Sequence, residues 1–279
     1  MVSNIYMRSR DPLFQRALVD VVRGNPHLFS GADHSIPAGE KEWSGLPVIF
    51  DEVFTGLYRL GRFSSASLLG TNPDISVHAK LLTGGLLPLC ATLASESIFK
   101  VFEGDEKSDA LLHGHSYTAH AVGCQVAVES LREMMSMDGT GAWDWAKEAG
   151  WRGSEQGQRP GVPDTKRDQS ELLGVSDITQ PVWSMWPRDF VESLSQQTTK
   201  VTGVWALGSV LAISMRAEDG AGYESNAAAG LQASLREGTG SWNAHTRVLG
   251  NVFYVMASLT TTQESIRAIQ KLLLEALKT

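Results

Sequence analysis

Residues 46–53 read LPVIFDEV, a short continuous run of apolar residues that ends in two acids. Such a run is typical of a strand that is buried on both faces of a parallel sheet. Residues 75–85, ISVHAKLLTGG, alternate apolar and polar side chains before Lys80 and a glycine turn, which predicts a second strand with the lysine at its end. The run LLPLCATLAS at residues 86–95 is a third strand candidate. Several such runs separated by loops and helices predict an α/β fold.

Two helices are predicted on either side of these strands. Residues 11–24, DPLFQRALVDVVRG, place apolar side chains at near-helical spacing and end in a glycine, which predicts a short amphipathic helix. Residues 117–136 form a longer helical segment rich in small residues. The composition then changes, because residues 138–170 are rich in Gly, charged residues and Trp and contain two prolines. This segment predicts a helix fragment and a long exposed connection between domains.

The last third of the chain predicts a compact α+β unit. Residues 201–215 predict two short strands or one bent strand, and residues 245–258 predict another strand. Helices are expected at residues 187–197, 225–238 and 261–278. We therefore expect a larger domain over residues 1–138, an exposed connection over 139–180 and a small α+β domain over 181–279.

The expected boundaries of the last two helices follow from capping and periodicity. Ser225 is the predicted N-cap of the helix at 225–238, and Gly238 is its predicted stop. The terminal helix is amphipathic, with its core positions predicted at Ile266, Ile269, Leu273 and Leu277.

Composition and charge narrow the class of protein. The net charge of −7 argues against a general nucleic-acid-binding protein, which normally shows a basic face. No apolar run reaches the ~20 residues that a membrane span requires, and the N-terminus shows no signal core with a cleavage site. We therefore expect a mitochondrial or cytoplasmic protein with no targeting segment in this chain. Cys90 and Cys124 are the two cysteines, and both are expected to be small buried hydrophobic residues of a reducing compartment.

The acids and the lysine at the predicted strand ends are the candidate chemical groups. Asp51 and Glu52 stand at the carboxyl end of one strand, and Lys80 stands at the end of another. In open α/β sheets, ligands bind outside the carboxyl ends of the strands. A carboxylate and an amine are therefore expected to face one crevice. The alternative, a structural ion pair between Asp51 and Lys80, is about equally compatible with their spacing.

Two further segments carry candidate binding groups. Gly114, Ser116 and Thr118 lie just before or at the start of the predicted helix, and a helix N-terminus with hydroxyls beside it favours an anion. An N-cap without a ligand is the alternative. Arg247 lies in an apolar, strand-like run. Because arginine is rarely buried without a partner, we expect a carboxylate partner for it on the protein or on a substrate.

Three motifs together carry a resemblance to a known family. DEVFTGLYRLGR (51–62), AKLLTGGLLPL (79–89) and HGHSYTAHAVGCQVA (113–127) occur in this order. In order and spacing they resemble the second half of the class III pyridoxal-phosphate (PLP) aminotransferases, which have the aspartate-aminotransferase fold, fold type I. The resemblance covers nearly the whole chain from about Asp11. It implies that residues 1–138 are the C-terminal part of the PLP-binding large domain.

The resemblance implies a role for each matching residue. Lys80 matches the lysine that binds PLP covalently and shuttles the proton, and Asp51 matches the aspartate that pairs with the pyridine nitrogen. Ser116 matches a position that binds the cofactor phosphate, with Gly114 and His115 before it contributing backbone. A lysine in a partly desolvated site beside a cation has a lowered pKa and acts as nucleophile and base.

Two arginines match substrate-side positions of the family. Arg247 matches an arginine that holds a substrate carboxylate, and Arg59 falls on a substrate-side position of the first motif. Within the family, the sequences LPVIFDEVFTGLYRLGRFSSASLLG and HTRVLGNVFYVM resemble more closely those of the branch that acts in biotin synthesis. That branch transfers the amino group of S-adenosylmethionine to 8-amino-7-oxononanoate and gives 7,8-diaminononanoate. In eukaryotes it is fused to a dethiobiotin synthetase, and a homodimer is implied.

One departure from the family pattern leaves alternatives open. Family members carry a long segment before DEVFTG with a glycine–serine phosphate loop and an aromatic residue stacked on the ring, and this chain starts shortly before DPLFQR. We therefore expect a C-terminal fragment that binds PLP weakly or not at all on its own. The alternatives are a truncated non-catalytic product and a class III transaminase that acts on another substrate, such as an ω-amino acid.

Overall fold

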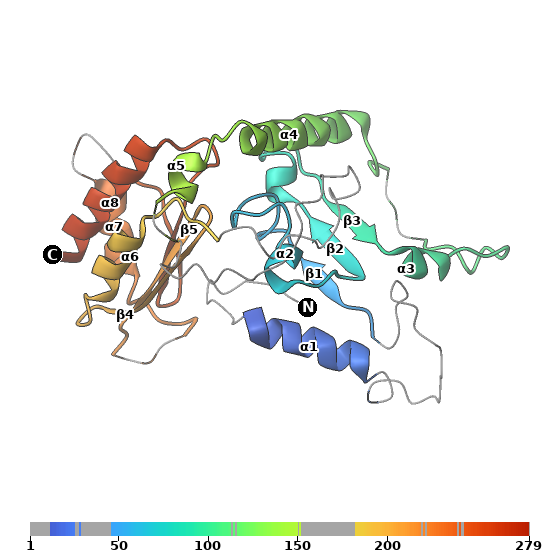
Figure 1. Ribbon diagram of the computed structural model, residues 1–279, viewed down its shortest axis with the longest axis horizontal. Coiled ribbons are helices and arrows are strands. Elements are labelled where there is room, and N and C mark those ends of the chain that lie inside the picture. The colour runs from blue at the N-terminus through green and yellow to red at the C-terminus, as the bar shows by residue number, and fades with distance from the viewer. Residues whose placement is uncertain are drawn as a thin grey trace, which may run out of the picture.

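The computed structural model describes residues 12–25, 28, 46–112, 114, 116–149, 151, 182–218, 220, 222–238, 240 and 243–278. These residues form two sheets with helices around them (Figure 1). The predicted α/β class is confirmed. No helix within the described ranges is both long and apolar enough to cross a membrane.

The first sheet has three strands in the order β1-β2-β3. β1 (Ile49–Asp51) runs parallel to β2 (Ile75–His78), and β3 (Ala91–Ala94) runs antiparallel to β2. All three predicted strands therefore exist. The expectation that the first strand is buried on both faces is wrong in part, because Phe50 is fully buried while Ile49 is 38% exposed.

Short helices follow the strands of this sheet. They are α2 (Ala66–Leu69), the 3₁₀ helix η2 (Lys80–Leu82) and α3 (Glu96–Lys100). The long helix α4 (Ala121–Gly139) crosses above the sheet in Figure 1. It begins four residues later than predicted, because His120 is its N-cap and accepts a 3.1 Å hydrogen bond at Nδ1 from the backbone N–H of Gly123.

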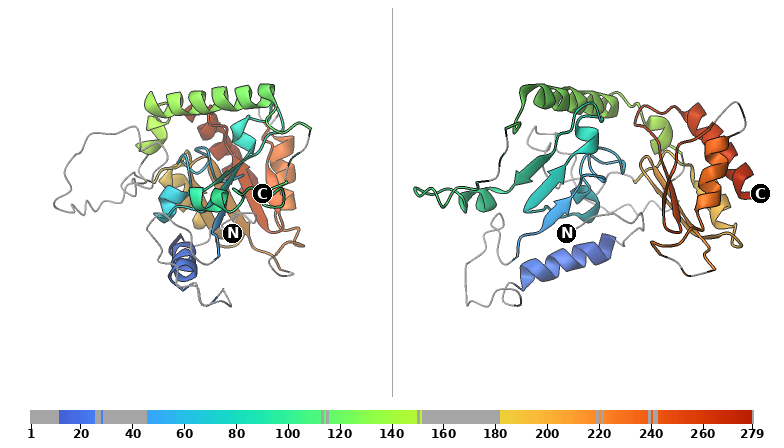
Figure 2. Two further views of the ribbon diagram at one scale, coloured as in Figure 1. Left: turned by 90° about the vertical axis from the view of Figure 1, so that its right-hand side faces the viewer. Right: turned by 180° about the vertical axis from the view of Figure 1, so that it is seen from behind.

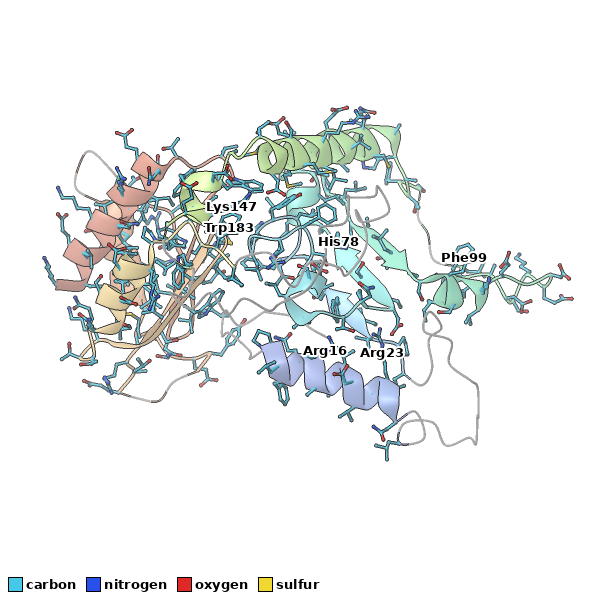
Figure 3. All side chains as sticks on the ribbon, in the orientation of Figure 1. Arg16, Arg23, His78, Phe99, Lys147 and Trp183 are labelled. Atoms are coloured by element: carbon cyan, nitrogen blue, oxygen red, sulfur yellow. The ribbon has the colours of Figure 1, made fainter. Side chains whose placement is uncertain are left out.

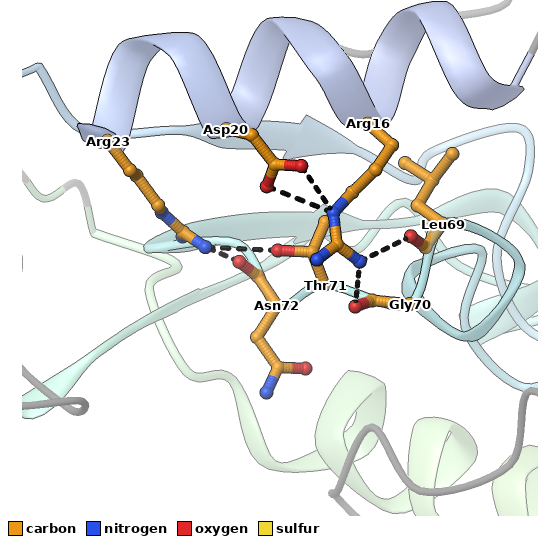
Figure 4. A network of polar contacts seen from close by, with 7 residues as sticks. All are labelled: Arg16, Asp20, Arg23, Leu69, Gly70, Thr71 and Asn72. Carbon is orange, nitrogen blue, oxygen red and sulfur yellow. Dashed lines mark hydrogen bonds and ion pairs between the residues drawn. The ribbon is translucent and has the colours of Figure 1, made fainter. Parts of the chain in front are cut away.

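The amphipathic helix predicted near the N-terminus is α1 (Pro12–Gly24). Two arginines tie it to the segment after α2 (Figure 4). Arg16 donates to the carbonyl oxygens of Leu69 (3.1 Å) and Gly70, and Arg23 donates to Thr71 Oγ1 (3.1 Å) and the carbonyl of Asn72 (2.6 Å). Most of the apolar side chains of α1 point away from the core, and the exposed ones are Leu13, Phe14, Leu18 and Val21.

The second sheet is antiparallel, with the strand order β4-β5-β7-β6. Its strands are β4 (Val201–Leu207), β5 (Val210–Met215), β6 (Arg247–Leu249) and β7 (Val252–Met256). Residues 201–215 thus form two strands, one of the two predicted arrangements. The single strand expected at 245–258 is wrong, because a turn at Gly250, with φ of 58°, splits it into a hairpin.

Three helices cover one face of this sheet (Figures 1 and 2). They are α6 (Arg188–Ser195), α7 (Ala229–Glu237) and α8 (Gln263–Lys278). The N-cap of α7 is Ala228 and not the predicted Ser225, while Gly238 ends the helix as expected. In α8 the predicted positions Ile266, Leu273 and Leu277 are buried, Ile269 packs against the core, and Leu272 is a further buried position.

Two side chains near the beginning of the predicted exposed connection are buried. Trp143 and Ala146, at the short helix α5 (Asp144–Lys147), are 1% and 0% exposed. Trp143 stacks on Trp183 at 5.8 Å between ring centroids and donates a 2.9 Å hydrogen bond from Nε1 to the carbonyl of Leu259. Figure 3 labels Trp183 and Lys147 beside α5. Residues 152–180 of the predicted connection lie outside the described residues.

Both cysteines depart from expectation. Cys90 and Cys124 are free thiols and both are exposed, so the prediction that they are small buried hydrophobic residues is wrong. Cys124 stands in the first turn of α4, where the side chain faces solvent.

Candidate active site

Lys80 begins the 3₁₀ helix that follows β2. The backbone is extended at Ala79 and then turns to a φ of 50° at Lys80. A left-handed φ is uncommon for a residue with a Cβ atom and costs of order 1–3 kcal/mol. Such strain persists where the surrounding structure enforces it, and it is concentrated at functional sites.

Asp51 lies at the carboxyl end of the neighbouring strand. Because β1 and β2 are parallel and Asp51 is in register with Val77, the two strands end at the same edge of the sheet. Asp51 is half-buried, and its Oδ1 accepts a 3.2 Å hydrogen bond from the backbone N–H of Val53. The predicted proximity of the carboxylate and the amine is reflected in their electrostatic interaction, which favours the charged form of Lys80.

The ring of Phe54 lies close to both Lys80 and a second cation. The Lys80 Nζ lies 5.1 Å from the ring centroid of Phe54, and the Arg59 Cζ lies 5.0 Å from the same centroid. Both distances are within the range of cation–π attraction. The predicted site residues Lys80 and Arg59 are thus brought together by a residue that sequence reasoning did not single out.

The charges around Lys80 favour the neutral amine. Partial burial lowers the pKa of Lys80, the positive charge of Arg59 lowers it further, and Asp51 acts in the opposite direction. Burial also lowers the pKa of Arg59. Its Nε is buried without a hydrogen-bond partner among the described residues, and its Nη1 lies 3.6 Å from the Sδ of Met256. The Lys80 side chain is nevertheless exposed, so it combines access to solvent with a pKa below the ordinary lysine value.

Glu52 has a structural role, unlike its neighbour Asp51. Its carboxylate is 2% exposed and accepts hydrogen bonds from Ser64 Oγ (2.6 Å) and the backbone N–H of Ser65 (2.8 Å). Buried carboxylates require such donors. The two acids of the LPVIFDEV stretch therefore have different roles. Asp51 acts on Lys80, and Glu52 stabilises the loop that follows β1.

The four-stranded sheet places Arg247 on the face that meets this loop. Arg247 pairs with Tyr254 across β6 and β7, and Tyr254 and Met256 share one face because side chains alternate along a strand. Tyr254 and Phe54 pack against one apolar cluster, and Met256 contacts Arg59. Burial raises the pKa of Tyr254, and the charge of Arg247 opposes that shift.

For Arg247 the expected carboxylate partner is either on the protein or on a substrate. The side chain is exposed, and no ion pair joins it to a carboxylate within the part of the chain that the structure describes. A protein carboxylate partner is therefore not found there. The side chain is accessible at the sheet face next to the loop that carries Phe54 and Arg59.

The predicted phosphate-binding segment makes none of the contacts that join Lys80, Phe54 and Arg59 within the described residues. Gly114 and Ser116 are exposed, and Ser116 lies in a turn that precedes α4. The helix N-terminus is capped by His120, so Ser116 is not the N-cap. His115 lies outside the described residues.

A separate cavity of about 640 Å³ lies between α7 and β6. Gln232, Arg236, His245 and Thr246 are among its lining residues. Its lining does not include Lys80, Phe54 or Arg59. This cavity is therefore distinct from the surroundings of Lys80.

Comparison with known proteins identifies the relatives of the chain. The family described as aminotransferase class-III matches residues 43–143. The bifunctional dethiobiotin synthetase/adenosylmethionine-8-amino-7-oxononanoate aminotransferase of Emericella nidulans is 55% identical over 96% of this chain and 31% of its own length. The mitochondrial bifunctional dethiobiotin synthetase/7,8-diamino-pelargonic acid aminotransferase of Oryza sativa subsp. japonica is 39% identical over 91% of this chain and 24% of its own. This chain thus spans less than a third of either relative.

Solved structures share the fold. An amine transaminase from an uncultivated Pseudomonas species, in its PLP-bound form, superposes with a TM-score of 0.60 at 22% identity. The match covers 84% of this chain and 44% of that protein. The predicted fold class, part of the PLP-dependent transferase fold type I, is confirmed.

Proposed function

Because residues 43–143 belong to the class-III aminotransferase family, we propose that this chain is the catalytic-lysine portion of a PLP-dependent aminotransferase of biotin synthesis. The proposed reaction transfers the amino group of S-adenosylmethionine to 8-amino-7-oxononanoate and gives 7,8-diaminononanoate. The observation that carries this proposal is the 55% identity, over 96% of the chain, with the fungal bifunctional enzyme. The substrates are proposed from that relative.

The residues around Lys80 fit pyridoxal phosphate. Covalent attachment requires a neutral amine, and burial and Arg59 both lower the pKa of Lys80. A protonated pyridine nitrogen requires a carboxylate, and Asp51 ends the strand beside that of Lys80. When bound, the cofactor withdraws electrons from the carbon that bears the amino group and so makes its proton acidic.

The chain's own groups would then divide the work. Lys80 Nζ binds the cofactor, takes the proton from the substrate carbon in the first half of the reaction and returns a proton in the second. The Asp51 carboxylate would pair with the protonated pyridine nitrogen and stabilise its positive charge. Arg247, exposed on the sheet face that meets the Phe54 loop, binds a substrate carboxylate, and Arg59 contributes on the same side.

We further propose that Gly114, His115 and Ser116 bind the cofactor phosphate of a neighbouring subunit. Gly114 and Ser116 are exposed, which suits a group that serves another chain. A homodimer follows from this proposal. Light scattering of the full-length polypeptide tests it, and a monomer that binds PLP would contradict it.

Cofactor binding is tested by absorbance. Adding PLP to the full-length polypeptide is expected to give an absorbance band of the bound cofactor that is lost in Lys80→Ala. Lys271→Ala is the matched control, because Lys271 is an exposed lysine on α8 and its loss is expected to leave the band intact. A band that persists in Lys80→Ala would contradict the assignment of Lys80.

Substrate identity is tested with a panel of amino donors in a coupled transamination assay on the full-length polypeptide. Activity with S-adenosylmethionine and 8-amino-7-oxononanoate is expected. Activity with an ω-amino acid but not with S-adenosylmethionine would show a class III transaminase of different specificity. Inactivity with every donor, despite a Lys80-dependent band, would favour a non-catalytic product.

A further inference from the structure

The ring of Phe54 is shared by two cations. Arg59 Cζ and Lys80 Nζ lie 5.0 Å and 5.1 Å from its centroid. The two cations are therefore at most about 10 Å apart, and the charge of Arg59 acts on Lys80. Like charges at such separations repel, most strongly where water is partly excluded. The ring attracts each cation separately, so it holds together two groups whose charges oppose each other.

Few other charges act on Lys80. The groups that influence it are Arg59, from the loop after β1, and Asp51, at the end of β1. Helix α4 packs against η2 through a neutral group, because Ser130 Oγ donates a 2.9 Å hydrogen bond to the carbonyl of Leu81. Within the described residues, no ion pair joins Lys80 or Arg59 to a carboxylate. The repulsion between the two cations is therefore only partly balanced.

Arg59 is fixed in place by backbone contacts with the second sheet. Its carbonyl oxygen accepts hydrogen bonds from the backbone N–H (2.9 Å) and the Oγ (3.2 Å) of Ser209. Its guanidinium reaches Met256 of β7. Because the backbone is anchored independently of the side chain, the guanidinium can be replaced without removing these hydrogen bonds.

We propose that Arg59 is a positioning residue for Lys80, which uses the shared Phe54 ring to hold a positive charge beside the amine and so favours the neutral, nucleophilic form. This inference deepens the proposed function, because a neutral amine is the form that attacks a carbonyl cofactor. Only the purpose of the neutral amine, attack on the cofactor, rests on the proposed function. The ionisation of the amine itself does not depend on any cofactor.

The test measures the ionisation of Lys80 directly, without a cofactor. The protein is reductively methylated with formaldehyde and a borane over a range of pH, and modification of Lys80 is followed by peptide mass spectrometry. Lys271, an exposed lysine on α8, is the internal standard. The variants are R59M and R59Q, which remove the charge, and R59K, which retains it. Circular dichroism establishes that each variant is folded.

The expected result is that the midpoint of Lys80 modification moves to higher pH in R59M and R59Q. It should stay near the wild-type value in R59K, and the Lys271 midpoint should not change in any variant. A purely structural role for Arg59 would not shift Lys80 alone. An unchanged Lys80 midpoint in folded R59M and R59Q would overturn the inference.

The proposed function can fail separately from this inference. If the pH midpoint of Lys80 modification shifts as expected but no Lys80-dependent PLP band forms, Arg59 lowers the pKa of Lys80 and the aminotransferase proposal is rejected. If the band forms and the midpoint does not shift, the aminotransferase proposal stands and the role of Arg59 is rejected.

Discussion

Ser64 Oγ donates a 2.6 Å hydrogen bond to Oε1 of Glu52, and this contact closes the loop that carries Phe54 and Arg59. The backbone N–H of Ser65 donates to Oε2 of the same carboxylate at 2.8 Å. Both oxygens of a buried charge are thereby satisfied by donors only twelve and thirteen residues further along the chain. The geometry of the candidate site depends on this local closure.

Replacing Glu52 by Gln should destabilise the fold. The amide keeps the shape of the carboxylate but turns one acceptor into a donor that faces a hydrogen-bond donor. We expect the free energy of unfolding to fall by about 1–3 kcal/mol, measured by urea denaturation. Asp51→Asn is the matched control, because Asp51 is only half-buried, and its effect should be smaller. Equal losses in the two variants would contradict the structural role of Glu52.

Replacing Gly208 by Ala should disrupt the contact between the β4–β5 turn and the Arg59 loop. Gly208 has a φ of 55°, and an added Cβ would lie 2.3 Å from the Gly61 nitrogen and 2.4 Å from the Arg59 carbonyl oxygen. Backbone atoms on both sides leave no room for adjustment. We expect a loss of unfolding free energy above about 3 kcal/mol, from steric overlap and backbone strain together.

Gly230→Ala is the control for that variant. Gly230 lies in α7, and an added Cβ would meet nothing within 4 Å. Alanine is favoured over glycine in a helix by about 0.5–1 kcal/mol, so this variant should be more stable than the wild type. Similar losses in both variants would show that the tight contact at Gly208 does not matter.

Tyr58 should make the fold sensitive to alkaline pH. Burial raises the pKa of Tyr58 to about 12 from its ordinary value of 10.0. The negative charge of Asp138 and a hydrogen bond with its side chain raise this pKa in the same direction. Because the folded-state pKa is higher, the neutral phenol stabilises the fold below pH 10, and this contribution is lost as the pH rises from 10 towards 12. The unfolding free energy of Tyr58→Phe should fall less steeply over this range than that of the wild type. Parallel curves would exclude the effect.

Trp143 should be one of the most sensitive core positions. It is 1% exposed, stacks on Trp183, lies 5.1 Å from the ring of Tyr58 and donates to the carbonyl of Leu259. Trp143→Ala should cost about 3–5 kcal/mol of unfolding free energy, measured by denaturation followed by circular dichroism. Trp143→Phe keeps a ring but loses the hydrogen bond, and its cost should be smaller. An effect below about 1 kcal/mol for Trp143→Ala would contradict the assigned burial.

The Lys80 end of the site could be predicted from the sequence because its signals are local. An apolar run before Asp51 and an alternating run before Lys80 predict two neighbouring strands, and parallel strands end at the same edge of a sheet. Phe54 could not be placed in this way, because its contact with Lys80 depends on how the chain folds back over the 25 residues between them. An aromatic residue two positions after Glu52 is nevertheless a usable signal.

Other departures have identifiable physical causes. The segment around Trp143 is polar on average, so its composition predicts exposure. Its Trp143 and Ala146 side chains are nevertheless buried. The hairpin of β6 and β7 was missed although Gly250-Asn251 between two apolar runs is a recognised turn signal. Arg247 is expected to have a carboxylate partner on the protein or on a substrate, and its side chain is exposed on the edge strand β6, where a substrate can reach it.

The anchoring of Arg59 has a mechanical consequence. The carbonyl of Arg59 accepts a hydrogen bond from Ser209, in the turn between β4 and β5. Its guanidinium contacts the Phe54 ring, which also contacts Lys80, the lysine that follows β2 in the other sheet. A tilt of the four-stranded sheet would therefore pull on Arg59 and change its distance from the amine. We therefore expect a ligand that moves the four-stranded sheet to change the ionisation of Lys80 without contacting it.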